Sequence, residues 1–353
     1  MEEATTSTPA QASGSRIEKT REFFKENLDI FCCPKTGGPL ELQDDALYSP
    51  QADHRFPFEE KMPSLFWPNE WEADADDVTD RMKAFYEETP FPNYDNFDNV
   101  ASLVEKARKG VFAKSLDDQV PFGTRIIECG CGTGQLTNFM SVANRSCFGT
   151  DMCMNSLGLA NDFKEKNGLE RANFLQMNLF NPCFKPGTFD LVVSNGVLHH
   201  TSNPFLAFQT ISKMVKPKGY ILIGLYHMYG RLITDTRRVI FNMTNNRFKF
   251  LDKRTISDKY SEGKQKAWFM DQYKNPHESK HTIGEVLKWI DKIGFKFISS
   301  IPTSRPFDRF SEKTRLFKPT RPGNWLERMM VELAMVREGS EEGGFFIMIA
   351  QRP

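Results

Sequence analysis

The stretch Arg125–Gly134, RIIECGCGTG, constrains the fold more than any other part of this sequence. An apolar run ends there in an acid and passes into glycines at three alternate positions. Helix-length segments then alternate with short apolar runs as far as residue 228. Strands separated by helices of this length are joined in parallel, because a parallel connection needs a long crossover. The pattern therefore predicts an α/β protein with a doubly wound, mostly parallel sheet.

Seven strands are expected, and two of them stand apart from the others. Five come from the alternating region, within residues 125–129, 146–151, 173–179, 189–200 and 219–226. The other two, FKFISSI and GGFFIMIAQ, are separated by a long polar connection near the end of the chain. That connection leaves them free to pair antiparallel at one edge of the sheet, so the last strand is expected to be antiparallel.

The rest of the chain divides into segments of different composition. We expect a disordered tail over residues 1–18, a small β-rich module with tight turns over 19–66, and a helical lid or linker over 67–115. The α/β domain then covers 116–353, with a basic insertion at about 229–280.

The overall charge excludes a general attraction to nucleic acid or membrane. The chain has 46 basic and 46 acidic residues, so its formal net charge is zero. Locally, residues 67–99 hold ten acidic and two basic residues (net −8), whereas residues 213–274 hold fourteen basic and five acidic residues (net +9). These segments could dock on each other, bind an anionic ligand, or face solvent as two helical surfaces.

The seven cysteines and the start of the chain are typical of a protein in a reducing, cytoplasm-like compartment. An odd number of cysteines without regular spacing is typical of reduced thiols. No basic-then-apolar leader opens the chain, and no apolar run approaches the roughly 18 residues of a membrane-spanning helix. We therefore expect a soluble, cytoplasmic protein with no membrane span.

The residues around the glycines distinguish between two nucleotide ligands. A dinucleotide loop has the spacing G-x-G-x-x-G, but the position of its last glycine is here Gln135. Glu128 precedes the loop, where its charge would repel a pyrophosphate and attract a cationic amino group. Asp151, at the end of the next strand, can accept both hydroxyls of a ribose, and Asn178 can meet an adenine edge. A ligand that joins an adenosine to an amino acid suits this loop better than NAD.

Together these motifs resemble those of class I S-adenosylmethionine-dependent methyltransferases, in the branch shared with quinone-methylating enzymes. The family's first motif is matched by IIECGCGTG, its second by GTD and its fourth by FDLVVSNGVLHHTSNP. The region of its fifth strand is matched by MVKPKGYILI. The resemblance implies a Rossmann-like fold with S-adenosyl-L-methionine as the cofactor. It also implies the residues that contact this cofactor, which are Glu128, Gly130, Cys131, Gly132, Thr133, Gly134, Asp151, Met152, Asn178, Leu179 and Asn195.

The module at 19–66 resembles the zinc-ribbon-like partner proteins that activate some methyltransferases. Their Cys-Pro-x-Cys-x-Gly-x-Leu pattern begins in CCPKTGGPLEL, but Thr36 and Gly37 stand where the second cysteine is expected. Cys32, Cys33 and His54 alone cannot complete a tetrahedral zinc site. The sequence thus predicts no metal site, and a metal-free docking module that can contact another protein.

Three histidines are the candidate general bases. A cofactor that brings its own activated methyl group needs no catalytic side chain for an amine or carbanion acceptor, whereas a hydroxyl acceptor benefits from a base such as His. His199 and His200 follow the fourth strand, and His227 follows the fifth. Each of the three could instead be a structural histidine.

Further residues are expected to contact substrate. The aromatic segment FYEETPFPNY would form a lid or only pack a helix end, and DQYKNPHESKHT would contact substrate or make structural hydrogen bonds. YHMYGRLITDTRR would lie near the mouth of the cleft, where an arginine could meet an anionic group, or form an ordinary solvated helix. His277 and His281 have the spacing of a metal pair on a helix, but Pro276 places them in a turn. The candidate substrate residues are Tyr86, Tyr94, Tyr226, Tyr229, Arg231, Tyr273, His277 and His281.

The sequence thus favours methyl transfer to a small-molecule or lipid-like acceptor beneath a roof formed by residues 213–280. An RNA acceptor such as tRNA, bound by the basic segment 213–274, is the alternative hypothesis. A non-catalytic scaffold that binds S-adenosylmethionine is the third.

Overall fold

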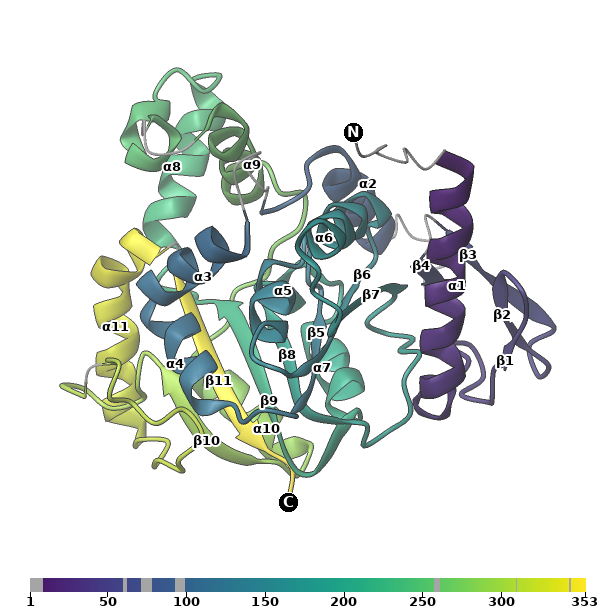
Figure 1. The fold of residues 1–353 in the computed structure, drawn as a ribbon. Coiled ribbons are helices and arrows are strands. Elements are labelled where there is room, and N and C mark those ends of the chain that lie inside the picture. Colours follow the sequence, from purple (N-terminus) through teal and green to yellow (C-terminus); the bar gives the residue numbers. More distant parts are fainter. Residues whose placement is uncertain are drawn as a thin grey trace.

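One sheet organises the fold, as the computed structural model in Figure 1 shows. The structure describes residues 9–59, 62–70, 78–92, 99–256, 261–308, 310–342 and 344–353. Within these residues the sheet has eleven strands, in the order β1-β2-β3-β4-β7-β6-β5-β8-β9-β11-β10. The strands are β1 Glu41–Leu42, β2 Ala46–Ser49, β3 His54–Glu59, β4 Met62–Leu65, β5 Arg125–Cys129, β6 Ser146–Asp151, β7 Ala172–Met177, β8 Phe189–Asn195, β9 Val215–Tyr226, β10 Lys296–Ile301 and β11 Phe345–Gln351.

The helices connect these strands and cover the sheet. They are α1 Pro9–Asn27, α2 Val78–Glu88, α3 Val100–Lys109, α4 Val111–Gln119, α5 Gln135–Ser141, α6 Met154–Asn167, α7 Pro204–Ser212, α8 Leu232–Met243, α9 Glu262–Tyr273, α10 Ile283–Lys292 and α11 Trp325–Glu342. Short 3-10 turns occur at Leu28–Ile30, Leu198–His200, Lys249–Leu251 and Lys253–Ile256. All seven cysteines are free and buried.

The central strands confirm the predicted α/β architecture. Strands β7, β6, β5, β8 and β9 pair in parallel, and β11 pairs antiparallel with both β9 and β10. The two late strands therefore form the expected antiparallel edge. The predicted number of seven strands is too small for the whole sheet, because β1 to β4 extend it beyond β7.

The two faces of the sheet are covered by different helices, because side chains alternate along each strand. Ile127 and Val192 face one hydrophobic cluster, which includes residues of α1, α7, α10 and α11. Their neighbours Ile126 and Val193 face the other cluster, which includes residues of α3, α4, α5 and α6. Continuous apolar strands such as RIIEC follow from this burial on both faces.

The N-terminal module is built into the sheet of the larger domain. Strand β4 pairs in parallel with β7, so the module continues the sheet through main-chain hydrogen bonds. The amide of Cys32 donates to the carbonyl of Cys183 (2.9 Å), and the amide of Lys185 donates to the carbonyl of Ile30 (2.9 Å). The ring of Phe31 packs on that of Phe184, with centroids 4.6 Å apart. At least this part of the module's contact surface is therefore used within the same chain.

Two expectations about helices need correction. Residues 9–18 were expected in a disordered tail, but they belong to α1, whose later residue Phe24 is fully buried against Phe31 and Phe58. Residues 1–8 lie outside the described part of the chain. The helical linker expected to end at residue 115 runs on to Gln119 in α4, which is separate from α3 because Gly110 leaves the helical conformation (φ −88°, ψ 118°).

The basic insertion forms a separate lobe. In Figure 1, α8 and α9 project from one end of the molecule, above α11 and α3. Phe241 from α8 and Phe269 and Tyr273 from α9 form a small buried cluster that joins the two helices. The inner side of α9 faces the carboxyl edge of the sheet, where it contributes to the site described next.

Candidate active site

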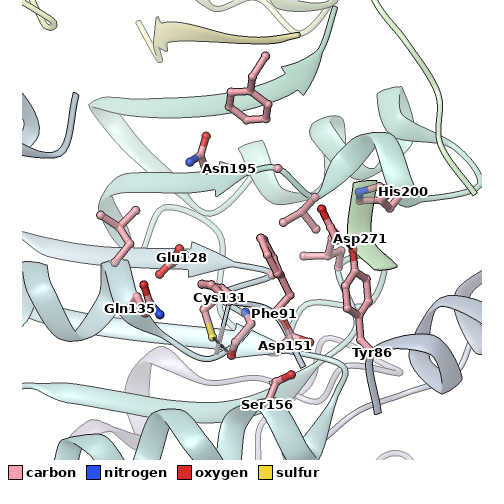
Figure 2. A pocket seen from close by; sticks show the side chains of 18 of the residues that line it. Tyr86, Phe91, Glu128, Cys131, Gln135, Asp151, Ser156, Asn195, His200 and Asp271 are labelled. Atoms are coloured by element: carbon pink, nitrogen blue, oxygen red, sulfur yellow. Dashed lines mark hydrogen bonds between the residues drawn. The ribbon is translucent and has the colours of Figure 1, made fainter. Parts of the chain in front are cut away.

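A cavity of about 820 Å³ lies at the carboxyl ends of the central strands (Figure 2). Its lining includes the ends of β5, β6, β7, β8 and β9, the helix α2 and the helix α9. The chain runs outward in both directions from β5 and β8, and ligands in such sheets bind at this reversal of strand order. The position matches the ligand edge predicted from the sequence.

The glycine loop after β5 forms the floor of the cavity. Gly130 and Gly132 have φ angles of +77° and +52°, in the left-handed region that glycine adopts without strain. A Cβ on Gly132 would lie 2.3 Å from the carbonyl oxygen of Phe91, so any larger residue would push the loop away from the lid. Gly130, Cys131 and Gly132 line the cavity, as predicted.

Two members of the predicted loop do not line the cavity. Thr133 is fully buried, and its hydroxyl donates a hydrogen bond to the carbonyl of Pro92. Gly134 begins α5 with φ +71°, where a Cβ would collide with Phe174 and Ala160. Thr133 and Gly134 therefore fix the loop against its surroundings, while Gln135 reaches the cavity in their place.

A buried acid marks one end of the cavity. Glu128, at the end of β5, accepts a hydrogen bond from the hydroxyl of Thr137 (2.5 Å). Burial raises the pKa of Glu128 to about 7, although the bond from Thr137 opposes the shift. Oδ1 of Asn195, at the end of β8, is buried without a hydrogen-bond partner. Among the residues that the structure describes, Glu128 has no cation beside it, and Oδ1 of Asn195 has no donor, although both groups line the same cavity. A ligand with a cationic amino group would satisfy both.

The raised pKa of Glu128 predicts a pH-dependent affinity for S-adenosylhomocysteine. The cationic amino group prefers the ionised carboxylate, and below pH 7 an increasing fraction of Glu128 is protonated. We expect the affinity to fall about tenfold from about pH 8 to about pH 6. Calorimetry in buffers of different ionisation enthalpy measures both this fall and the accompanying proton release. Glu128→Gln should remove the pH dependence between these values; a dependence that persists in this variant would contradict the assignment.

A second acid stands at the end of β6. Oδ2 of Asp151 accepts a hydrogen bond from the amide of Gly132 (2.8 Å), and Oδ1 accepts one from the amide of Cys153 (3.0 Å). Burial raises the pKa of Asp151, and these main-chain bonds oppose that shift. A carboxylate has about four acceptor positions, so each oxygen can still accept a ligand hydroxyl. Met152, the next residue, also lines the cavity.

The third predicted nucleotide contact has a different local role. Asn178 lines the cavity, but its Nδ2 donates to the carbonyl of Trp67 (2.8 Å) and to Oδ1 of Asn69 (2.9 Å). Its Oδ1 accepts from the amide of Phe180 (3.1 Å). The side-chain amide nitrogen is thus engaged by the segment after the N-terminal module, whereas Oδ1 keeps one acceptor position, so the adenine contact stays a prediction. Leu179 lines the cavity beside it.

The segment expected to form a lid is described as α2 and residues 89–92. Glu87 holds α2 against α6, because its two carboxylate oxygens accept the amides of Met154 (3.1 Å) and Asn155 (3.4 Å). Tyr86, on the same helix, and Phe91, beyond its end, line the cavity, as Figure 2 shows. Tyr94 lies outside the described residues.

A polar cluster lies across the cavity from the glycine loop. Asp271 of α9 accepts the hydroxyl of Tyr86 at Oδ1 (2.9 Å) and the amide of Gln272 at Oδ2 (2.8 Å). Gln272 also donates to the hydroxyl of Tyr226 (2.7 Å). Burial, followed by the charge of Asp271, raises the pKa of Tyr86 well above its usual value. All four side chains line the cavity, so an acceptor there would meet hydroxyl, amide and carboxylate groups together.

His200 is the histidine that lines this part of the cavity. Its Nδ1 lies 2.8 Å from the carbonyl oxygen of His277. A carbonyl oxygen only accepts hydrogen bonds, so Nδ1 carries the proton and Nε2 is the unprotonated nitrogen. Burial lowers the pKa of His200, although the charge of Asp271 opposes this shift. The neutral ring is therefore the dominant form at neutral pH.

The other two predicted bases do not line the cavity. His199 is fully buried, and neither of its ring nitrogens has a hydrogen-bond partner. Burial lowers its pKa well below the usual value. His227 is also fully buried, and its Nδ1 accepts the amides of Tyr229 (3.2 Å) and Gly230 (3.3 Å). His199 therefore packs beneath the site, and His227 holds the turn after β9.

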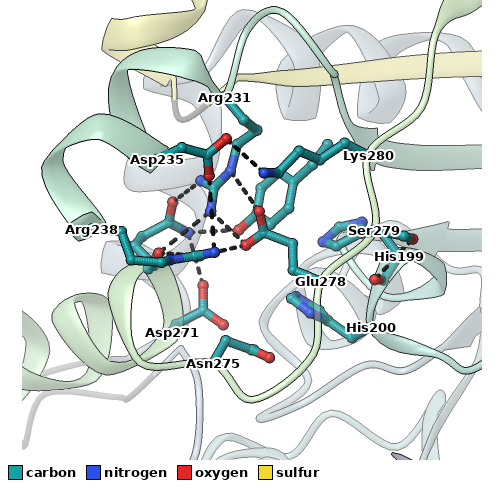
Figure 3. A network of polar contacts seen from close by, with 12 residues as sticks. His199, His200, Arg231, Asp235, Arg238, Asp271, Asn275, Glu278, Ser279 and Lys280 are labelled. Atoms are coloured by element: carbon teal, nitrogen blue, oxygen red, sulfur yellow. Dashed lines mark hydrogen bonds and ion pairs between the residues drawn. The ribbon is translucent and has the colours of Figure 1, made fainter. Parts of the chain in front are cut away.

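Arg231 was expected at the mouth of the cleft, but it is fully buried in the polar network of Figure 3. Its NH2 lies 2.6 Å from Oε2 of Glu278, and its NH1 donates to Oε1 of Gln272 (2.6 Å). The guanidinium also lies 3.8 Å from the centroid of the Tyr226 ring. Arg238 shares the same carboxylate at 2.7 Å. Arg231 thus supports the cavity wall from behind and does not face a substrate.

Removing the carboxylate of Glu278 should strongly destabilise the fold. Glu278→Ala leaves the guanidinium of Arg231 buried without its counter-ion, and we expect the free energy of unfolding to fall by about 3–5 kcal/mol. Chemical denaturation measures the loss. The matched control is Glu105→Ala, which breaks an exposed, solvent-screened ion pair with Lys109 and should leave the free energy of unfolding almost unchanged. Equal losses in the two variants would contradict a structural role for the buried pair.

The remaining predicted substrate residues surround this network but do not line the cavity. The hydroxyl of Tyr273 donates to Asp252 (2.7 Å), and the Nε2 of His277 lies 3.1 Å from the carbonyl of Thr201. His281 contacts Ser279 (2.8 Å) and Glu285 (3.1 Å). Tyr229 packs near His227. In the described part of the chain, no group of three or more His, Cys, Asp and Glu side chains could hold a metal ion.

An apolar wall completes the cavity, and sequence analysis did not identify it. Residues from five separate parts of the chain form it, namely Val111, Phe112, Leu136, Val197, Ile301, Phe310, Phe345 and Ile347. Each belongs to an ordinary apolar pattern, so nothing local distinguishes these residues from core residues. Sequence analysis also did not identify Trp268 and Gln272 of α9 as lining residues. Which face of α9 lines the cavity depends on how the insertion folds, and the sequence pattern does not show that.

Comparison with known proteins agrees with this geometry. Residues 127–223 match the family model described as a methyltransferase domain. An uncharacterized protein of Synechococcus, syc1184_c, is 27% identical over 49% of this chain and 48% of its own length. The ubiquinone biosynthesis O-methyltransferase of Photobacterium profundum is 30% identical over 29% of this chain and 44% of its own length. The chain thus spans about half the length of these relatives.

Solved structures with similar folds are more distant in sequence. An S-adenosylmethionine-dependent methyltransferase from Mesorhizobium loti is 16% identical, with a TM-score of 0.43 over 70% of this chain and the whole of that one. A chain from the complex of the Haloferax volcanii Trm112 methyltransferase activator with a methyltransferase is 14% identical, with a TM-score of 0.43 over 72% of this chain and 93% of that one.

Residues 127–223 therefore match a methyltransferase domain, and the sheet they belong to has the Rossmann-like order described above. This agrees with the methyltransferase class predicted from the motifs. Among the relatives with a stated activity are several ubiquinone biosynthesis O-methyltransferases, each matched over less than half of its length.

Proposed function

We propose that this protein transfers a methyl group from S-adenosylmethionine to a hydroxyl of a small-molecule or lipid-like acceptor, with His200 as the general base. One observation carries the proposal: a single cavity has Glu128 and Asp151 at one side and His200 at the other. The two carboxylates would accept hydrogen bonds from the amino and ribose hydroxyl groups of the cofactor, and the histidine would accept the proton of a hydroxyl acceptor.

The residues present fit the cofactor. Glu128 and Asn195 would hold its amino-acid end, because both offer buried acceptor oxygens to an amino group. Asp151 would hold the ribose hydroxyls, and Met152 and Leu179 would contact the adenine. When bound, S-adenosylmethionine supplies a methyl group that its sulfonium has already activated.

His200 would take the proton of the acceptor hydroxyl at Nε2. The carbonyl of His277 keeps the other proton at Nδ1, so the ring is oriented and its tautomer is fixed before the acceptor arrives. Asp271 and Tyr86 would position the acceptor through their polar groups, and the lid would exclude water. The proton held at Nε2 would leave to solvent after the product departs.

The apolar wall favours an acceptor with an apolar body. Phe112, Phe310 and Ile347 lie on the cavity lining, and their burial by a ligand would contribute binding energy in proportion to the apolar area covered. RNA receives less support from the insertion, because Arg231 and Arg238 are both engaged by Glu278 within the network of Figure 3.

The decisive experiment asks which molecules accept the methyl group. Cell extract is incubated with the protein and methyl-labelled S-adenosylmethionine, then separated into organic-soluble molecules, water-soluble small molecules, RNA and protein. We expect label in the small-molecule or organic-soluble fraction, and a much lower rate of labelling with His200→Ala. Label in RNA would replace this proposal with the RNA hypothesis. Binding of S-adenosylhomocysteine without label in any fraction would favour a non-catalytic scaffold.

A further inference from the structure

The outer side of the inserted lobe exposes many apolar side chains. Along α8, Val239 and Met243 lie one turn apart on the same side and are 57% and 82% exposed. The segment after α8 adds further exposed side chains. We call the set of Val239, Met243, Phe248, Phe250, Leu251 and Ile256 the tip surface. Exposed apolar side chains scattered singly are ordinary, whereas a group of them on one lobe indicates a contact surface.

Basic residues are interspersed among these apolar ones. Arg247, Lys249, Lys253 and Arg254 belong to the same short segment, and the acid between them, Asp252, is buried. Although burial raises its pKa, hydrogen bonds from Arg254 and Tyr273 lower the pKa of Asp252 overall, so it stays ionised inside the lobe. The outward charge of the segment is therefore positive.

We propose that the tip surface docks on an anionic lipid bilayer. Apolar side chains that enter the boundary of the acyl chains, together with Lys and Arg that meet anionic headgroups, are the two components of interfacial binding. Both components occur in one protruding lobe here (Figure 1). No helix in the described part of the chain is long and apolar enough to cross a membrane, so the contact is interfacial.

The geometry of the aromatic side chains favours lipid over RNA. Single-stranded nucleic acid stacks on exposed flat ring faces. Phe248 and Phe250 instead pack edge to face, with centroids 5.7 Å apart and planes at 65°. The other four members of the tip surface are aliphatic and offer no ring on which a base could stack.

The segment that carries most of the tip surface contacts the roof of the cavity through Arg254. The guanidinium of Arg254 lies 4.5 Å from the ring centroid of Trp268, and Trp268 lines the cavity. Docking through the tip surface would therefore place the roof of the cavity at the bilayer. The docking itself does not depend on the proposed methyl transfer, and its test uses no activity.

The test is co-flotation of the full-length protein with vesicles. One set contains phosphatidylcholine alone, and the other contains phosphatidylcholine with phosphatidylglycerol. We expect binding to the anionic vesicles that weakens with added salt and is much weaker on the neutral vesicles. The double variant Met243→Ser with Phe250→Ser should lower the partition coefficient by about tenfold or more. Arg247→Gln with Lys253→Gln should lower it on anionic vesicles only.

The matched control is Phe122→Ser, which removes a 74% exposed ring away from the lobe and should leave partitioning unchanged. Circular dichroism checks that each variant is folded, which is expected because the altered side chains are exposed. Absence of vesicle binding, or equal loss with Phe122→Ser, would overturn the proposal. A concentration-dependent dimer abolished by the tip variants would replace lipid with a second copy, and a gel shift of an RNA oligonucleotide lost in them would replace it with RNA.

Discussion

Asp151→Ala should lower the affinity of the protein for S-adenosylhomocysteine by at least about 100-fold. Two hydrogen bonds from ribose hydroxyls to a carboxylate would be lost, and hydrogen bonds to charged groups contribute about 1.5–3 kcal/mol each. The amide of Gly132 would lose its acceptor as well, so the glycine loop would be held less firmly. Isothermal calorimetry measures the affinity, and NADH should bind neither the wild-type protein nor the variant.

The control for this variant is another acid on the following helix. Asp162 is exposed on α6, and Asp162→Ala should leave the affinity unchanged. Asp151→Asn retains an acceptor oxygen and should fall between the wild-type protein and Asp151→Ala. Circular dichroism separates loss of binding from loss of fold. Unchanged affinity in Asp151→Ala would contradict both the ribose contact and the proposed function.

The place of the glycine loop and its neighbouring acids on the cavity lining was predictable because their signals are local. The strand, the acid at its end and the glycines occupy ten consecutive residues, and a parallel sheet brings its strand ends to one edge. Glu128 and Asp151 follow from that geometry. Gln135 likewise excluded a dinucleotide loop without any tertiary information.

The roles of the histidines and of Arg231 depend on contacts that are distant in sequence. His199 and His200 are adjacent, yet the carbonyl of His277 fixes the ring of His200 at the cavity while His199 is buried beneath it. Arg231 was expected to face a substrate because it follows the strand end. Glu278, 47 residues later, instead neutralises it inside the lobe.

The contribution of the N-terminal module was also hidden from sequence patterns. Its resemblance to activator proteins indicated docking, but not where it docks. Strand β4 joins the sheet beside β7, and Ser64 donates to the side chain of Gln176 (2.7 Å). Gln176 in turn donates to the carbonyl of Met152 (2.8 Å), a residue on the cavity lining. The module therefore supports the nucleotide side of the cavity from within the same chain, which explains why Asn178 is engaged.

His200→Ala should lower kcat by about 10²–10⁴-fold while leaving the affinity for S-adenosylhomocysteine within about twofold of the wild-type value. The ring lies across the cavity from the residues assigned to the cofactor, so its loss should affect proton removal and not cofactor binding. Because burial lowers the pKa of His200, the wild-type rate should be constant near neutral pH and should fall only below about pH 6.5. Single-turnover rates with the acceptor identified by labelling measure both effects.

Two further measurements separate a base from a structural histidine. Added imidazole should partly restore turnover in His200→Ala, because it can enter the space of the missing ring and accept the proton, whereas it cannot repair a packing defect. His54→Ala removes an exposed histidine from β3 and should change neither the rate nor the pH profile. Full turnover in His200→Ala, or an unchanged acid limb, would show that the acceptor loses its proton without this histidine. In that case an amine or carbanion acceptor, which needs no base, would replace the hydroxyl in the proposed reaction.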